Sequence, residues 1–192
     1  MTRTVMHPAT TEVLAGLDRS REGLRAAIEQ VPAQLRDRRP ASDRWSVAGI
    51  LEHLALVEER LTAALAAKLA AAREAGLGPE DGDPSLLSPE MRARATDRRE
   101  RREAPEPARP SGLAHQVAWE RAEAARAAFR LLVTRADGLA LGRVIHEHPR
   151  FGALNVYQWA GFLAAHESRH TEQIREMSGQ LQKPFARPAT PG

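Results

Sequence analysis

The sequence contains no cysteine, so the folded chain has no disulfide, no thiolate metal ligand and no cysteine nucleophile. Any thiol chemistry would need a thiol supplied by a substrate or cosubstrate. No apolar run is long enough to span a bilayer, and the N-terminal stretch "MTRTVMHPATTEVLAGL" lacks the continuous apolar segment of a signal peptide. We therefore expect a cytoplasmic protein without membrane contact.

Aromatic residues are also scarce, at 4% of the 192 residues, whereas alanine, leucine, arginine and glutamate are abundant. The abundant residues lose little side-chain freedom in helices, which favours helix over sheet. A hydrophobic content of 42% is enough for a core, and the length fits a single domain over residues 1–192. The 28 basic residues are interleaved with 25 acidic ones, as on solvated helix surfaces, so we expect no nucleic-acid partner.

Hydrophobic periodicity predicts four long helices. The first covers Thr10–Val31, the second begins at a Ser46 N-cap and continues through Leu69, the third covers Ser111–Ala136, and the last begins at an Asn155/Gln158 capping box. On the third helix, the predicted packing residues are Leu113, Val117, Ala124, Phe129, Leu131 and Leu132. No strand pattern is visible. The predicted fold is therefore all-α, an antiparallel four-helix bundle.

A long charged connector separates the second and third predicted helices. It covers about residues 76–112, where a Gly-, Pro- and Asp-rich start is followed by the charged run "RARATDRRERRE" and a proline-punctuated end. We expect a short exposed helix after Pro89 and otherwise irregular structure. At the C-terminus, about residues 180–192 are predicted to form a flexible tail.

Three histidines could share one metal ion. The stretch "AAHESRHTEQI" places His166 and His170 four residues apart, on one face of the last helix, and points Glu167 about 100° away. His53 lies on the apolar stripe of the second helix. Buried imidazoles without a shared partner lose hydration, and a divalent ion would supply that partner. Three nitrogen ligands leave coordination positions open, as in catalytic zinc sites.

The same stretch matches the His-Glu-x-x-His motif of zinc proteases, in which the glutamate is the base and a third ligand follows downstream. No histidine follows His170 in this chain. We therefore keep the metalloprotease as a minor alternative and expect Glu167 at the surface or the rim of the site.

The other histidines are assigned structural or surface positions. His148 is expected in a turn beside His146, and His7 and His115 are expected at the surface. Trp159 either packs in the core or forms a pocket wall.

Two segments resemble the DinB-like superfamily, which includes bacillithiol S-transferase. They are Arg44–Leu61 and His148–Ile174. The matching features are Trp45-Ser46, Glu52-His53-Leu54, His148-Pro149, Phe151-Gly152, Gln158-Trp159, and His166 with His170 and Gln173-Ile174. The resemblance implies a four-helix bundle, often a homodimer, in which His53, His166 and His170 bind a divalent ion.

The leading hypothesis is a metal-dependent thiol S-transferase that acts on electrophilic small molecules, with a low-molecular-weight thiol as its partner. The thiol is implied by the resemblance alone. The alternative is a non-catalytic, stress-related dimeric protein that binds a metal or a small ligand. Three imidazoles suit zinc, nickel or iron, and the sequence does not distinguish among these ions.

Overall fold

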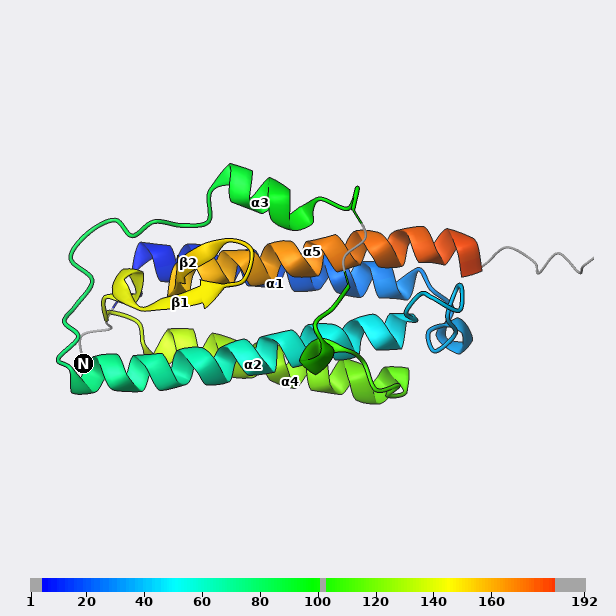
Figure 1. Cartoon of the computed structure of the whole chain (residues 1–192), viewed down its shortest axis with the longest axis horizontal. Coiled ribbons are helices and arrows are strands. Elements are labelled where there is room, and N and C mark those ends of the chain that lie inside the picture. Colours follow the sequence, from blue (N-terminus) through cyan, green and yellow to red (C-terminus); the bar gives the residue numbers. More distant parts are fainter. Residues whose placement is uncertain (1–4, 101–102, 182–192) are drawn as a thin grey trace, which may run out of the picture.

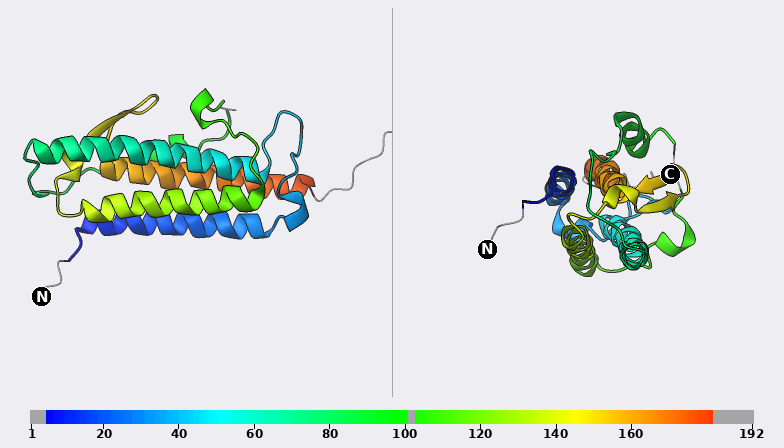
Figure 2. Two further views of the ribbon diagram at one scale, coloured as in Figure 1. Left: turned by 90° about the horizontal axis from the view of Figure 1, so that it is seen from below. Right: turned by 90° about the vertical axis from the view of Figure 1, so that its left-hand side faces the viewer.

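The computed structural model describes residues 5–100 and 103–181. Its four long helices lie side by side in Figures 1 and 2; they are α1 (Pro8–Glu29), α2 (Val47–Glu74), α4 (His115–Arg135) and α5 (Val156–Leu181). The shorter elements are helix α3 (Pro89–Thr96), 3-10 turns at Ala33–Leu35, Glu106–Ala108 and Leu141–Arg143, and strands β1 (Ile145–His148) and β2 (Gly152–Asn155). The described chain is thus mainly helical, as expected.

The long helices form two parallel pairs. Helices α2 and α4 run in the same direction, because Glu52 in the early part of α2 binds the backbone of Ser111 just before α4, whereas Arg73 near the end of α2 reaches the carbonyl of Arg135 at the end of α4. Helices α1 and α5 form the second parallel pair, as Figure 1 shows. The predicted antiparallel arrangement is therefore correct between the pairs and wrong within them. Parallel neighbours require a long crossover connection.

The connector between α2 and α4 supplies this crossover. Its helix α3 packs on α5, where Leu87 and Ala95 contact Ala165. At Gly161 of α5 an added Cβ would lie 2.8 Å from the Cβ of Leu87, so only glycine permits this approach. The short helix expected after Pro89 is confirmed. Because the connector lies along the bundle, it forms part of the wall of the candidate site.

A short antiparallel hairpin precedes α5, and the expectation that the chain has no strand is wrong here. Strands β1 and β2 pair from Ile145 opposite Asn155 to His148 opposite Gly152. The turn is held by Nδ1 of His148, which accepts the backbone N–H of Arg150 at 3.0 Å, and Gly152 takes a positive φ of 73°. Strands of four residues are too short to show an alternating pattern in the sequence.

Two helix predictions also need correction. Val117 and Leu131, expected to pack, are 50% and 48% exposed, and Ala124 is exposed as well. The buried face of α4 consists of Ala118, Ala122, Ala125, Arg126, Phe129 and Val133. The prediction favoured large apolar side chains, whereas α4 meets α2 largely through alanines.

The last helix ends slightly beyond the predicted start of the C-terminal tail. Helix α5 continues to Leu181, which is buried in the core, and residues 182–192 of the predicted tail lie outside the described residues.

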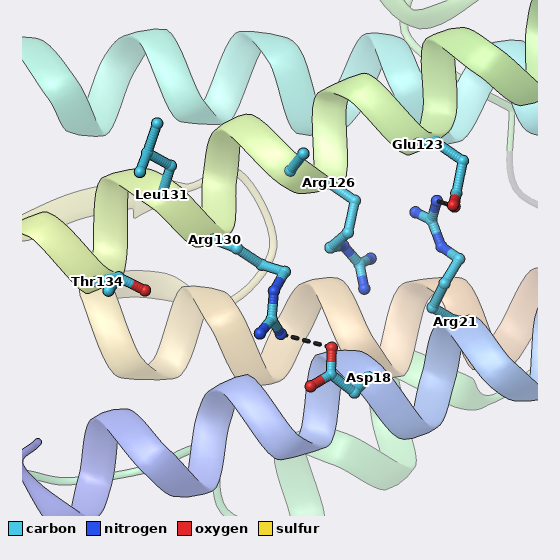
Figure 3. Close-up of a pocket in the computed structure, with 8 residues that line it drawn as sticks. Asp18, Arg21, Glu123, Arg126, Arg130, Leu131 and Thr134 are labelled. Carbon is cyan, nitrogen blue, oxygen red and sulfur yellow. Dashed lines mark hydrogen bonds and ion pairs between the residues drawn. The ribbon is translucent and has the colours of Figure 1, made fainter.

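A buried ionic cluster joins the four long helices. It consists of Arg21 of α1, Glu58 of α2, Arg126 of α4 and Glu167 of α5, none more than 7% exposed. Nε of Arg126 donates to Glu58 at 2.6 Å, and Nε of Arg21 donates to Glu167 at 2.8 Å. Burial raises the pKa of the Glu58 carboxyl, although Arg126 opposes this shift. Figure 3 shows Arg21 and Arg126 extending between α1 and α4.

The expectation for Glu167 is therefore wrong. Its exposed fraction is 1%, and Arg126 lies 3.3 Å from its second carboxylate oxygen. With about 100° of rotation per residue, fixing Glu167 toward the bundle interior turns His166 and His170 about 100° and 60° around the helix axis. Local sequence patterns do not reveal these contacts, because Arg21 and Arg126 lie 146 and 41 residues before Glu167.

We expect Glu167→Ala to destabilise the protein by about 3 kcal/mol or more, because it leaves buried guanidinium groups without part of their charge compensation. The matched control is Glu172→Ala on the same helix, where Glu172 is 54% exposed and pairs with Arg175. This control should change the free energy of unfolding by about 0.5 kcal/mol or less. Denaturant unfolding followed by circular dichroism measures both, and equal losses would contradict the role of the cluster.

Candidate metal centre

The structure brings the three predicted histidines to one point. Nε2 of His166 lies 3.4 Å from Nε2 of His53 and 3.2 Å from Nε2 of His170. The potential ligand atoms of all three lie within 4.8 Å of one another. Three nitrogens bound tetrahedrally to one zinc ion at 2.0–2.1 Å would be about 3.3 Å apart. The two short separations therefore fit a shared ion.

Hydrogen bonds on the far side of two rings fix their tautomers. Nδ1 of His53 lies 2.7 Å from the carbonyl oxygen of Ala108, which can only accept a hydrogen bond. Nδ1 of His170 lies 3.0 Å from the amide oxygen of Gln173, also an acceptor. Each Nδ1 therefore carries the proton, and each Nε2 presents a lone pair to His166. A cation at the shared point is the partner that suits these lone pairs.

The environment also keeps the imidazoles neutral. Burial lowers the pKa of His53. Burial, together with His170 and His53, lowers the pKa of His166 well below its ordinary value. For His170, burial and then the neighbouring His53 lower the pKa to about 3. Neutral imidazole is the form that binds metal ions.

Glu52 holds the connector beside this cluster. Its carboxylate accepts hydrogen bonds from the backbone N–H groups of Ser111 at 2.9 Å, Gly112 at 3.0 Å and Leu113 at 3.1 Å. Although burial raises the pKa of Glu52, these bonds, with that from the Ser111 hydroxyl, bring it below its ordinary value overall. The anchored connector places the Ala108 carbonyl against His53.

The role of Glu52 was missed in the sequence analysis, where it was only part of a motif. The available signal was a single carboxylate inside the apolar run "GILEHLAL". The contact with the Ala108 carbonyl could not be predicted, because any residue at that position offers the same backbone hydrogen-bond acceptor.

A cleft of about 1740 Å³ opens over the histidines, lined by α2, the connector, the β1–β2 hairpin and α5. All three histidines line it. Within residues 5–100 and 103–181, no fourth histidine, aspartate or glutamate joins their cluster. Trp45 lies beside His53, with ring centroids 4.8 Å apart, and Phe162 lies parallel to His166 at 5.7 Å. The arrangement can hold an ion and leave room for a ligand beside it.

The remaining histidines do not join the cluster. His148 was expected in a turn; it ends β1, holds the following turn through its Nδ1 and shares the cleft wall with His146. His7 is partly buried and caps α1 through its Nδ1, and His115 is also partly buried, so neither is simply a surface residue. Trp159 fulfils both alternatives, because it is 6% exposed and also lines the cleft.

Comparison with known proteins agrees with the geometry. The family model of the DinB superfamily matches residues 16–174, a range that includes all three histidines. The chain belongs to the DinB superfamily. It is similar to the "Uncharacterized protein YuaE" of Bacillus subtilis (strain 168), with 25% identity over 150 residues, which are 77% of this chain and 85% of YuaE.

No solved structure gave a significant match. Among the described residues, no helix combines the length and the hydropathy needed to cross a membrane. The match of the family model confirms the family resemblance inferred from the sequence motifs.

In the metal-free protein we expect stability to fall as the pH decreases below about 6.5, the ordinary pKa of histidine in an unfolded chain. The folded pKa values of His53, His166 and His170 are lowered, so the unfolded chain binds more protons in this range. The loss should approach about 1.4 kcal/mol per pH unit for each imidazole. Denaturant titrations of chelator-treated protein at several pH values between about 7 and about 5 measure it.

The control for this experiment is His170→Leu, which removes one of the shifted groups. Its stability should depend less steeply on pH than that of the wild type over the same range. Identical slopes would show that this imidazole is not kept neutral by the fold.

Proposed function

We propose that this DinB-superfamily protein is a metal-dependent enzyme that transfers a low-molecular-weight thiol to an electrophilic small molecule. The observation that carries the proposal is the convergence of three imidazole nitrogens beside a large cleft. Three neutral protein ligands with space next to them are the arrangement of catalytic zinc sites, whereas structural sites are closed by a fourth protein ligand. The thiol as cosubstrate is taken from the family resemblance.

The chain itself supplies binding and orientation. His53 and His170 keep their protons on Nδ1, so their Nε2 atoms stay available as ligands at neutral pH. His53, His166 and His170 would hold a divalent ion, which would keep its full charge beside neutral ligands and would lower the pKa of a bound thiol. In the proposed transfer, the sulfur would form a bond to the electrophilic carbon, the displaced group would leave with the electron pair of its former bond, and the thiol proton would pass to solvent. A chain without cysteine must take its sulfur nucleophile from outside.

The protease alternative does not fit the position of Glu167. A general base of that class must reach a water molecule at the metal. Glu167 is 1% exposed, is held by Arg21 and Arg126, and does not line the cleft. Glu167, the glutamate of the His-Glu-x-x-His motif, therefore stabilises the fold in this chain.

The non-catalytic binder is the remaining alternative, and the open cleft favours the enzyme over it. A site that only stores or senses a metal gains affinity from a fourth protein ligand, and the described residues provide three in the cluster. The volume over the cluster also exceeds what bound water requires.

The test uses purified protein loaded with zinc, nickel or iron and a panel of bacterial thiols and electrophiles. We expect about one bound ion per chain and a transfer rate above the uncatalysed rate for at least one pair. His53→Ala, His166→Ala and His170→Ala should each lose metal and activity while their helical circular dichroism signal remains. His115→Ala, which changes a histidine outside the cleft, is the matched control and should keep both.

Two outcomes would contradict the proposal in different ways. Full metal content without any rate above background would favour the non-catalytic binder. Unchanged metal content in all three variants would overturn the site itself.

A further inference from the structure

Aromatic residues gather around the cleft although the chain has few of them. The sequence holds four phenylalanines, three tryptophans and one tyrosine. Four of these eight line the cleft over the histidines: Trp45, Phe151, Trp159 and Phe162. Among the described aromatic residues, Phe129 and Tyr157 are buried completely and Trp159 packs in the core. Trp45, Phe151 and Phe162 are only partly buried, so part of their surface remains in the cleft.

Three of these rings and one histidine form a continuous surface, which we call the aromatic wall: His148, Phe151, Trp159 and Phe162. Phe162 lies in its middle, with ring centroids 4.5 Å from His148, 5.6 Å from Phe151 and 5.5 Å from Trp159. Phe162 also lies parallel to His166, at an interplanar angle of 9°. The wall therefore starts at the metal cluster and extends away from it along the cleft.

The wall is supported by two elements that hold each other in place. Trp159 and Phe162 belong to α5, and His148 belongs to β1. Nε1 of Trp159 donates to the carbonyl of His146 at 2.9 Å, which fixes the hairpin on the helix. Phe151 and Phe162 remain partly exposed, so ring surface is left for a ligand.

His148 adds a polar group to the wall. Its Nδ1 accepts backbone N–H groups of the turn, so the neutral ring carries its proton on Nε2. Burial, with Arg150 as the next cause, lowers the pKa of His148 to about 4, which keeps the ring neutral at physiological pH. Among the described residues, none accepts a hydrogen bond from this Nε2, and the ring lines the cleft.

The size of the cleft leaves room for a second molecule. At about 1740 Å³ it exceeds the roughly 300–1,000 Å³ of a pocket for one small ligand. A thiol beside the metal cluster would thus leave the aromatic wall available to its reaction partner.

We propose that the aromatic wall binds a flat aromatic or conjugated group of the electrophilic substrate. This group would lie next to His166, beside the place where a thiol would bind the metal ion. Stacked and edge-to-face contacts with partly exposed rings favour a planar π-system over an aliphatic group of similar size. This inference rests on the proposed function, because it assumes an ion at the histidines with space beside it. If the rings served only to pack the hairpin on α5, the site would show no preference for a planar ligand.

The test compares two probes that share one metal-chelating group, benzohydroxamate and acetohydroxamate, on the full-length zinc-loaded protein. We expect the wild type to bind benzohydroxamate about tenfold more tightly, after correction for the affinities of both probes for zinc in solution. Phe151→Leu and Phe162→Leu should each reduce this preference while leaving the affinity for acetohydroxamate and the zinc content unchanged. Trp119→Leu, which changes an aromatic residue outside the cleft, is the matched control and should keep the preference.

The outcomes separate this inference from the function on which it rests. Equal affinity of the wild type for the two probes would overturn the aromatic wall as a binding surface and leave the metal site standing. Binding of neither probe by zinc-loaded wild type would overturn the open metal site, and the inference with it. If the preference for benzohydroxamate remains in both wall variants, the aromatic ring of the probe binds to another part of the cleft, and the inference is wrong. Equal wild-type affinities overturn the inference even if a variant fails to fold, and either wall variant that folds is enough to test the role of the wall.

Discussion

The candidate metal centre requires three neutral imidazoles from two helices to converge on a single point. Two of the rings donate their only N–H away from this point, to the Ala108 carbonyl and to the Gln173 amide oxygen. The Nε2 lone pairs of His53 and His170 therefore both face Nε2 of His166, which can donate at most one hydrogen bond. Such a group of acceptors is costly to bury unless a cation joins it. The fold around it serves to hold the rings in this position.

Two other parts of the molecule maintain that geometry. The ionic cluster at the centre of the bundle fixes the rotation of α5 through Glu167, so that His166 and His170 face the cleft. The connector crosses the length of the bundle and is clamped by Glu52, which brings Ala108 against His53. The consecutive residues Glu52 and His53 thus act together. Glu52 orders the connector, and His53 donates a hydrogen bond to the Ala108 carbonyl that the ordered connector presents.

Local signals made much of this architecture predictable. The Ser46 side chain caps α2 by accepting the N–H of Gly49, and Asn155 and Gln158 form the predicted capping box of α5. The three histidines were identified because helical spacing and the family resemblance agreed on them. Non-local features were not predictable. The partners of Glu167, the parallel pairing of helices and the carbonyl of Ala108 all depend on contacts between residues far apart in sequence, and the hairpin is too short to show periodicity.

X-ray absorption spectroscopy of the metal-loaded protein tests whether the three histidines bind one ion, because it reports the ligand shell of that ion. We expect three imidazole nitrogens, at about 2.0–2.1 Å if the ion is zinc, and a further light-atom ligand from solvent. A shell with fewer than three imidazoles, or one in which a carboxylate of the protein replaces a histidine, would contradict a three-histidine metal site.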